Sequence, residues 1–203
     1  MGTHIKINEP PQSQNMCQGC QGHCCSLTVE LTSYDIARIV VEKGRDPKNF
    51  VKYTDADEND YSFKALGKRV KLILGHKKDG YCTFFDSKKT LKCSIDDSKP
   101  GICLAYPMDL HNGKSMLRTN VVCPLENLKK ADFVKMSTAA LEDCRWEWER
   151  HKEMLEDWNS FARGHENPEE FLRFAFREMQ LETSPWGAIY RKIRRKVFRL
   201  VKK

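Results

Sequence analysis

The number and spacing of cysteines constrain this chain more than any other feature. Nine cysteines occur in 203 residues, and Cys17, Cys20, Cys24 and Cys25 lie within nine positions. The two-residue spacing of Cys17 and Cys20 lets both sulfurs reach one metal centre, and Gly19 between them permits a tight backbone turn. We therefore predict a metal-binding knuckle rather than a group of buried free cysteines.

Four further cysteines form a second, more widely spaced set: Cys82, Cys93, Cys103 and Cys123. Cys103 follows Lys99-Pro100-Gly101, and Cys123 precedes Pro124, a step that also occurs at cluster ligands of bacterial ferredoxins. Eight thiolates would suit one cluster with extra cysteines, two four-cysteine sites, or a zinc site beside a cluster. We predict that all eight are metal ligands.

The ninth cysteine and one histidine are assigned other roles. Cys144 lies between Leu141 and Trp148 on an apolar stripe, so we expect a core cysteine. His23 lies inside the first cluster, where it is either a loop residue or a zinc ligand.

Positive charge is concentrated at one end of the sequence. The net charge is +7, but residues 191–203 carry eight Lys/Arg and no acid, so the other 190 residues hold 27 Lys/Arg and 28 Asp/Glu. This near-neutral body disfavours nucleic acid as a partner. No stretch approaches the ~20 apolar residues of a membrane span, and residues 1–15 lack an apolar signal-peptide core. Because an odd cysteine count also argues against disulfides, we expect a cytoplasmic protein with no integral membrane span.

The predicted fold class is α+β, with an irregular, metal-organised Cys-rich core and short antiparallel hairpins, followed by a helical C-terminal region. Four zones are expected along the chain. They are a flexible leader (1–15), a Cys-rich metal-binding domain (16–124), a helical region packing on it (125–183) and a basic amphipathic helix (184–203).

Local signals place the first helices. Thr32 and Asp35 form a capping box that opens a helix ending at Gly44. A second short helix is expected to start at Asp46-Pro47 and to include Phe50 and Tyr53. Apolar residues at three- and four-residue steps predict two later helices, over 136–158 and 171–179.

Strands are expected in three places. The first is 69–74, the second is the pair 81–85 and 91–95, and the third is the pair 108–111 and 114–118. Asn112-Gly113, which separates the last pair, is a strong signal for a hairpin turn.

Together these segments resemble the family of zinc- or iron-chelating proteins named for its CxxCxxCC motif, whose members are often described as containing Fe–S clusters. The matching segments are Cys17 to Cys25, Gly80 to Phe85, Cys93 to Ile95, Lys99 to Pro107 and Cys123-Pro124. The resemblance covers about residues 16–124 and implies eight metal-associated cysteines. Lys99 and Leu104 stand where the family usually has arginines.

The metal is predicted to be an Fe–S cluster. Structural zinc sites often use two C-x2-C knuckles and only one occurs here, whereas a larger cluster accepts dispersed cysteines. The cofactor is then one or two clusters, most simply [4Fe–4S], with zinc as the alternative. The expected function is electron transfer, or maturation of a partner protein or its metallocofactor.

Two other functions remain open. One branch of the family resembles bacterial flagellin lysine N-methylases, so a metal-dependent protein-modifying enzyme is an alternative. The chain has no Gly-rich βαβ fingerprint for S-adenosylmethionine. A zinc-stabilised interaction module is the third function.

The last segment predicts a partner. Residues 184–203 combine an apolar stripe at helical spacing with eight basic residues. Such a helix suits an acidic protein, an anionic membrane surface or a nucleic-acid backbone, or it packs its stripe on the body. We favour a protein partner, because a redox protein must dock to exchange electrons.

Overall fold

The computed structural model describes residues 21–57, 60–89, 92–111, 114–118, 121–123 and 131–183. Within these ranges helices are combined with short antiparallel strands, and residues 131–183 are mostly helical, so the predicted α+β class is confirmed. The expectations for Cys17, Cys20 and Pro124, for the leader and for the basic segment 184–203 lie outside the described residues.

The first long helix, α1 (Ser33–Lys43), begins and ends as predicted. The Thr32 side chain accepts a hydrogen bond from the backbone N–H of Asp35, and the Asp35 carboxylate accepts one from the Thr32 N–H. Gly44 ends the helix in the left-handed conformation (φ 59°), which glycine adopts without strain.

A three-stranded antiparallel sheet follows, in the order β1 (Val51–Asp55), β3 (Lys68–Leu74), β2 (Phe63–Ala65). The strand at 69–74 is confirmed as β3. The helix predicted from Asp46-Pro47 is wrong: only the 3-10 turn η2 (Pro47–Asn49) forms, and Phe50 caps it. Tyr53 instead lies in β1, opposite Leu72 of β3. The more buried side chains of β1 alternate along the chain, as in a strand with one face on the core, and this spacing does not suit a helix.

The second part of the Cys-rich region contains little regular structure. The strands predicted at 81–85 and 91–95 are wrong: in the described residues of these segments, 81–85 and 92–95, only isolated bridges form, His76 to Cys82 and Phe85 to Cys93. A bend at 81 and a turn at 83–84 interrupt the first of these segments. Two short helices come next, η3 (Asp96–Ser98) and α2 (Gly101–Ala105). The predicted hairpin is confirmed as β4 (Met108–His111) and β5 (Lys114–Leu117).

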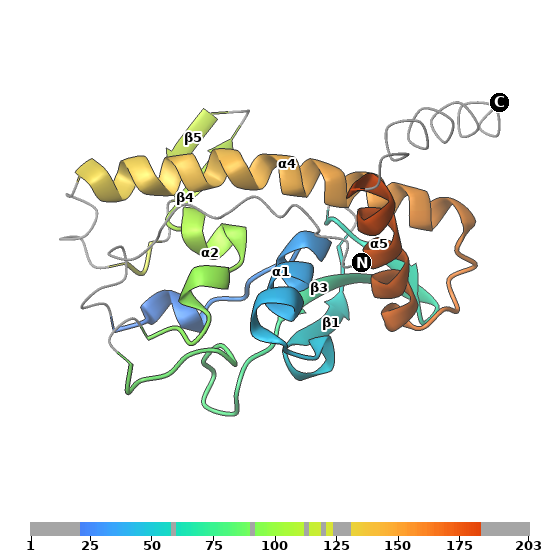
Figure 1. Cartoon of the computed structure of the whole chain (residues 1–203), viewed down its shortest axis with the longest axis horizontal. Coiled ribbons are helices and arrows are strands. Elements are labelled where there is room, and N and C mark those ends of the chain that lie inside the picture. Colours follow the sequence, from blue (N-terminus) through green and yellow to red (C-terminus); the bar gives the residue numbers. More distant parts are fainter. Residues whose placement is uncertain are drawn as a thin grey trace.

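The C-terminal helices are α4 (Ala131–Phe161) and α5 (Pro168–Thr183). Figure 1 shows α4 running along the length of the molecule, with α2 near its first half and α5 crossing near its second. The core at the α5 end is aromatic: Phe63 of β2 stacks on Phe171 of α5 at 4.2 Å between ring centroids. Trp158 of α4 packs on the same Phe171 ring and donates a hydrogen bond to the Lys64 carbonyl.

At its other end, α4 contacts α2 directly. A Cβ atom on Gly101 would lie 2.2 Å from the Sγ atom of Cys144, so only glycine permits this approach. Cys144 is 6 % exposed, which confirms the prediction of a core cysteine.

The search for membrane spans covered only the described residues. None of their helices combines the length and the apolar character needed to cross a bilayer.

Candidate metal centre

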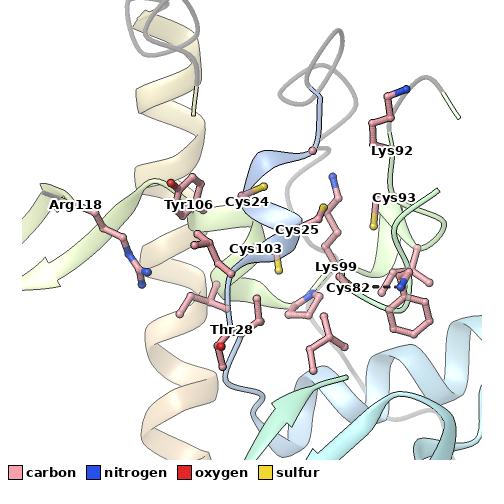
Figure 2. Close-up of a pocket in the computed structure, with 18 residues that line it drawn as sticks. Cys24, Cys25, Thr28, Cys82, Lys92, Cys93, Lys99, Cys103, Tyr106 and Arg118 are labelled. Atoms are coloured by element: carbon pink, nitrogen blue, oxygen red, sulfur yellow. Dashed lines mark hydrogen bonds between the residues drawn. The ribbon is translucent and has the colours of Figure 1, made fainter. Parts of the chain in front are cut away.

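Five of the eight predicted ligands line one cavity of about 80 Å³. They come from four separate segments of the chain, and Figure 2 shows their thiols around the same space: Cys24, Cys25, Cys82, Cys93 and Cys103. The remaining wall is largely apolar, and includes Leu27, Leu74 and Ile102.

The first segment is the 3-10 turn η1 (His23–Ser26), which carries Cys24 and Cys25. Gly22 precedes it with φ 77°, a conformation that L side chains rarely adopt. A Cβ on Gly22 would also lie 2.4 Å from Cε2 of Phe85. Glycine is therefore required here for the turn to lie against the loop that carries Cys82.

Backbone hydrogen bonds join this turn to the second segment, and the second segment to the third. The N–H of Cys82 donates to the Cys25 carbonyl at 2.7 Å, and Cys93 bridges to Phe85 three residues after Cys82. The N–H of Phe84 donates to the Cys82 Sγ atom at 3.3 Å (dashed in Figure 2). Amide groups that donate to a sulfur stabilise it as a thiolate and are typical around metal-bound thiolates.

Cys103 comes from the fourth segment, in the single turn of α2. Its N–H donates to the carbonyl of Pro100, which begins the helix. Lys99, Pro100 and Ile102 line the cavity beside it.

The local environment disfavours ionisation of these thiols. A hydrogen bond with Cys25, followed by burial, raises the pKa of Cys24. Burial raises the pKa of Cys82 to about 11, although the Phe84 N–H opposes this. Burial also raises the pKa of Cys103, and negative charge on Cys24 and Cys82 adds to the effect. A bound cation would reverse this balance, because thiolates are the form that binds metal.

Cys123 lies outside this cavity but close to its edge. The N–H of its neighbour Val122 donates to the Tyr106 hydroxyl at 2.7 Å, and Tyr106 lines the cavity. Burial is the main reason why the pKa of Tyr106 is raised, and negative charge on Cys24 and Cys123 contributes. Tyr106 therefore links the cavity wall to the residue that precedes Cys123.

The donor set matches a thiophilic centre in its chemistry. Thiolate sulfurs suit zinc and iron–sulfur clusters, and the five cysteines here line one cavity. In the part of the chain that the structure describes, no three His, Cys, Asp or Glu side chains are already arranged to hold a single ion. Cys17 and Cys20, the other members of the knuckle, lie outside that part.

Comparison with known proteins gives one match. The family model CxxCxxCC, described as "Putative zinc- or iron-chelating domain", matches residues 16–124, more than half of the chain. The chain belongs to the CxxCxxCC family. No curated protein and no solved structure matches significantly. The matched range contains every cysteine that lines the cavity.

In this CxxCxxCC domain, Lys99 and Leu104 stand at the two positions where the resemblance led us to expect arginines, and the structure shows where each side chain lies. Lys99 is 6 % exposed, lines the cavity and forms an ion pair with Asp96. Its positive charge lowers the pKa of Cys24, against the stronger effects that raise it. Leu104 faces away from the cavity and belongs to a small apolar cluster with Met108 and Leu141.

Several residues near the centre escaped the sequence analysis. Lys92 and Arg118 line the cavity, and no local pattern marks them, because their positions depend on the folding of distant segments. Tyr106 also lines the cavity; it lies in the matching segment Lys99 to Pro107 but was given no role. His23 is exposed in η1, and its carbonyl accepts a hydrogen bond from the Ser26 hydroxyl.

Proposed function

We propose that the CxxCxxCC domain binds an iron–sulfur cluster at this cavity and that the protein acts in electron transfer or in maturation of a partner or its metallocofactor. One observation carries the proposal: five thiols from four separated segments line a single apolar cavity. A cluster has several attachment points and so suits ligands dispersed along a chain.

Each group of residues would have its own role at this centre. Cys24, Cys25, Cys82, Cys93 and Cys103 would supply ligands, and Cys17, Cys20 and Cys123 would complete the site or build a second. When bound, the cluster supplies one-electron chemistry. The apolar wall keeps water away from the centre, the Phe84 N–H donates to the Cys82 sulfur, and Lys99 places positive charge beside Cys24.

Transfer of electrons also requires a partner. We assign docking to the basic segment 184–203, whose eight Lys/Arg suit an acidic protein surface.

The test is metal analysis of protein purified without oxygen. Iron, acid-labile sulfide and zinc are measured on one sample, together with the visible absorbance. We expect a brown protein with matched iron and sulfide. Colourless protein with stoichiometric zinc, and no cluster after reconstitution, would contradict the proposal and support a zinc-stabilised interaction module.

Two variants locate the centre. Cys103→Ser replaces a cavity thiol and should lose most of the bound iron. Phe171→Leu is the control, because Phe171 is also buried, lies in the aromatic core and does not line the cavity. Equal iron loss in both variants would place the centre elsewhere or indicate a general folding defect.

A further inference from the structure

A buried ion cluster joins α1 to α4. The Arg38 guanidinium lies 3.2 Å from the Asp35 carboxylate and forms a second ion pair with Glu147. The three side chains are 2–8 % exposed. Burial of such groups costs desolvation energy, so an ion cluster of this kind is a poor stabiliser compared with apolar residues. Its contacts indicate a different role.

The same side chains bind the backbone that precedes Cys103. The N–H of Gly101 donates to the Asp35 carboxylate at 2.8 Å, and the Arg38 guanidinium donates to the Lys99 carbonyl at 3.2 Å. One helical turn further along α1, Glu42 accepts a hydrogen bond from the Ser98 hydroxyl. One face of α1 therefore holds the segment 98–101 at three points.

Segment 98–101, which α1 holds in this way, forms part of the cavity wall. Lys99 and Pro100 line the cavity themselves, and the Pro100 carbonyl accepts the hydrogen bond from the Cys103 N–H. Any displacement of 98–101 would therefore move the Cys103 thiol. The ion cluster itself lines no part of the cavity.

Helix α4 contacts the ion cluster and segment 98–101 from the side opposite α1. Glu147 pairs with Arg38 from one side, and Cys144, one turn earlier on α4, touches Gly101. Segment 98–101 is thus enclosed between α1 and α4.

We propose that Arg38, with Asp35 and Glu147, is a positioning residue for the metal centre: it holds segment 98–101 so that the Cys103 thiol stays at the cavity wall. This inference rests on the proposed function, because it assigns Cys103 to the centre. Arg38 touches neither the thiols nor a metal and acts only through the backbone it binds.

The test compares two variants of the ion cluster, each made in the whole chain. Arg38→Lys keeps the positive charge but loses the planar fork that binds several acceptors at once. Glu147→Gln keeps the side-chain shape and removes one charge of the cluster. It is the second variant should Arg38→Lys fail to fold. Phe171→Leu is the control, because it perturbs the aromatic core without touching 98–101.

Two readouts are measured. The first is the iron and zinc content of the purified protein, with the electron paramagnetic resonance spectrum of any reduced cluster. The second is independent of metal: after chelation, the alkylation rate of Cys103 by iodoacetamide is followed by peptide mass spectrometry and compared between the wild type and each variant.

We expect Cys103 in Arg38→Lys to react at least about tenfold faster than in the wild type. Tenfold corresponds to ~1.4 kcal/mol, and loss of one hydrogen bond to a charged group costs about that much or more. Metal content should fall and the spectrum should change. Phe171→Leu, compared at matched thermal stability, should alter neither readout.

Wild-type reactivity of Cys103 with wild-type metal content in the folded variants would overturn the inference. The two proposals can fail separately. If the wild type contains no metal, the proposed function fails, while the alkylation rates still decide whether Arg38 positions Cys103.

Discussion

At the scale of single residues, α4 carries two titratable groups where an amphipathic helix would have apolar ones. Glu147 and His151 continue the buried line that runs through Cys144 to Leu155. Ser33 donates to the His151 Nδ1 atom through its N–H at 3.3 Å, and its hydroxyl lies 3.0 Å away. Burial lowers the pKa of His151 to about 3, so the imidazole is neutral in the fold.

This neutrality predicts a pH dependence of stability. A histidine in the unfolded chain has a pKa of ~6.5. Between that pH and about pH 3, His151 is therefore protonated in the unfolded state and neutral in the folded state. Stability contributed by neutral His151 is complete above the unfolded pKa and falls by ~1.4 kcal/mol per pH unit below it. Burial raises the pKa of Glu147, although Arg38 opposes this, and the raised pKa gives an opposite slope in part of this range.

The variant His151→Asn separates the two effects, because asparagine offers an acceptor near the Nδ1 position and does not titrate. The difference in unfolding free energy between wild type and variant should shrink as the pH falls from neutral toward 3. Urea unfolding at several pH values measures it. A difference that stays constant would show that His151 gains no stability from being neutral.

At the scale of elements, the contact between α2 and α4 depends on one missing side chain. Gly101→Ala should destabilise the protein by ~1–3 kcal/mol, the usual cost of overpacking, although alanine is intrinsically the better helix former. Thermal unfolding measures the loss. In a Cys144→Ala background the same substitution should cost much less, because the Sγ atom that the new methyl group meets is absent. Equal costs in both backgrounds would contradict this account.

Elements with local signals were predictable from the sequence, and elements fixed by distant partners were not. The capping box of α1 and the hairpin of β4 and β5 each need only neighbouring residues. Strand β2 was missed because its turn uses Leu66-Gly67, both with positive φ, where asparagine or aspartate would normally precede the glycine. The Leu66 N–H donates to the Glu166 carbonyl, so a loop a hundred residues later supports this turn.

The same distinction applies to the candidate site. Cysteine spacing and the family resemblance named the thiols, and five of them lie together. The contacts that hold segment 98–101 beside Cys103 could not be predicted, because Arg38 binds Lys99 and Glu147, which are 61 and 109 positions away. One signal was available: Glu147 falls on the apolar stripe of α4, where an acid is expected to have a buried partner.

At the scale of the whole molecule, the cavity ties together segments spread from Cys24 to Cys103. A ligand that binds only the folded chain stabilises it, by ~2.7 kcal/mol at 100 times its Kd. Removal of the metal by a chelator should therefore lower the melting temperature by several degrees, and metal added back should restore it.

Differential scanning calorimetry checks this prediction, with Cys103→Ser as the control that should respond little to chelator. An unchanged melting temperature in protein that had contained stoichiometric metal would contradict it. The metal would then not bind preferentially to the folded chain.

The enclosure of segment 98–101 between α1 and α4 has a consequence for biosynthesis. Chains fold from the N-terminus as they leave the ribosome, and Glu147 follows Arg38 by 109 residues. The cysteines that line the cavity therefore all emerge before the acid that completes their support. We expect metal delivery to be a late event that awaits emergence of α4, with the nascent thiols reduced but unloaded until then.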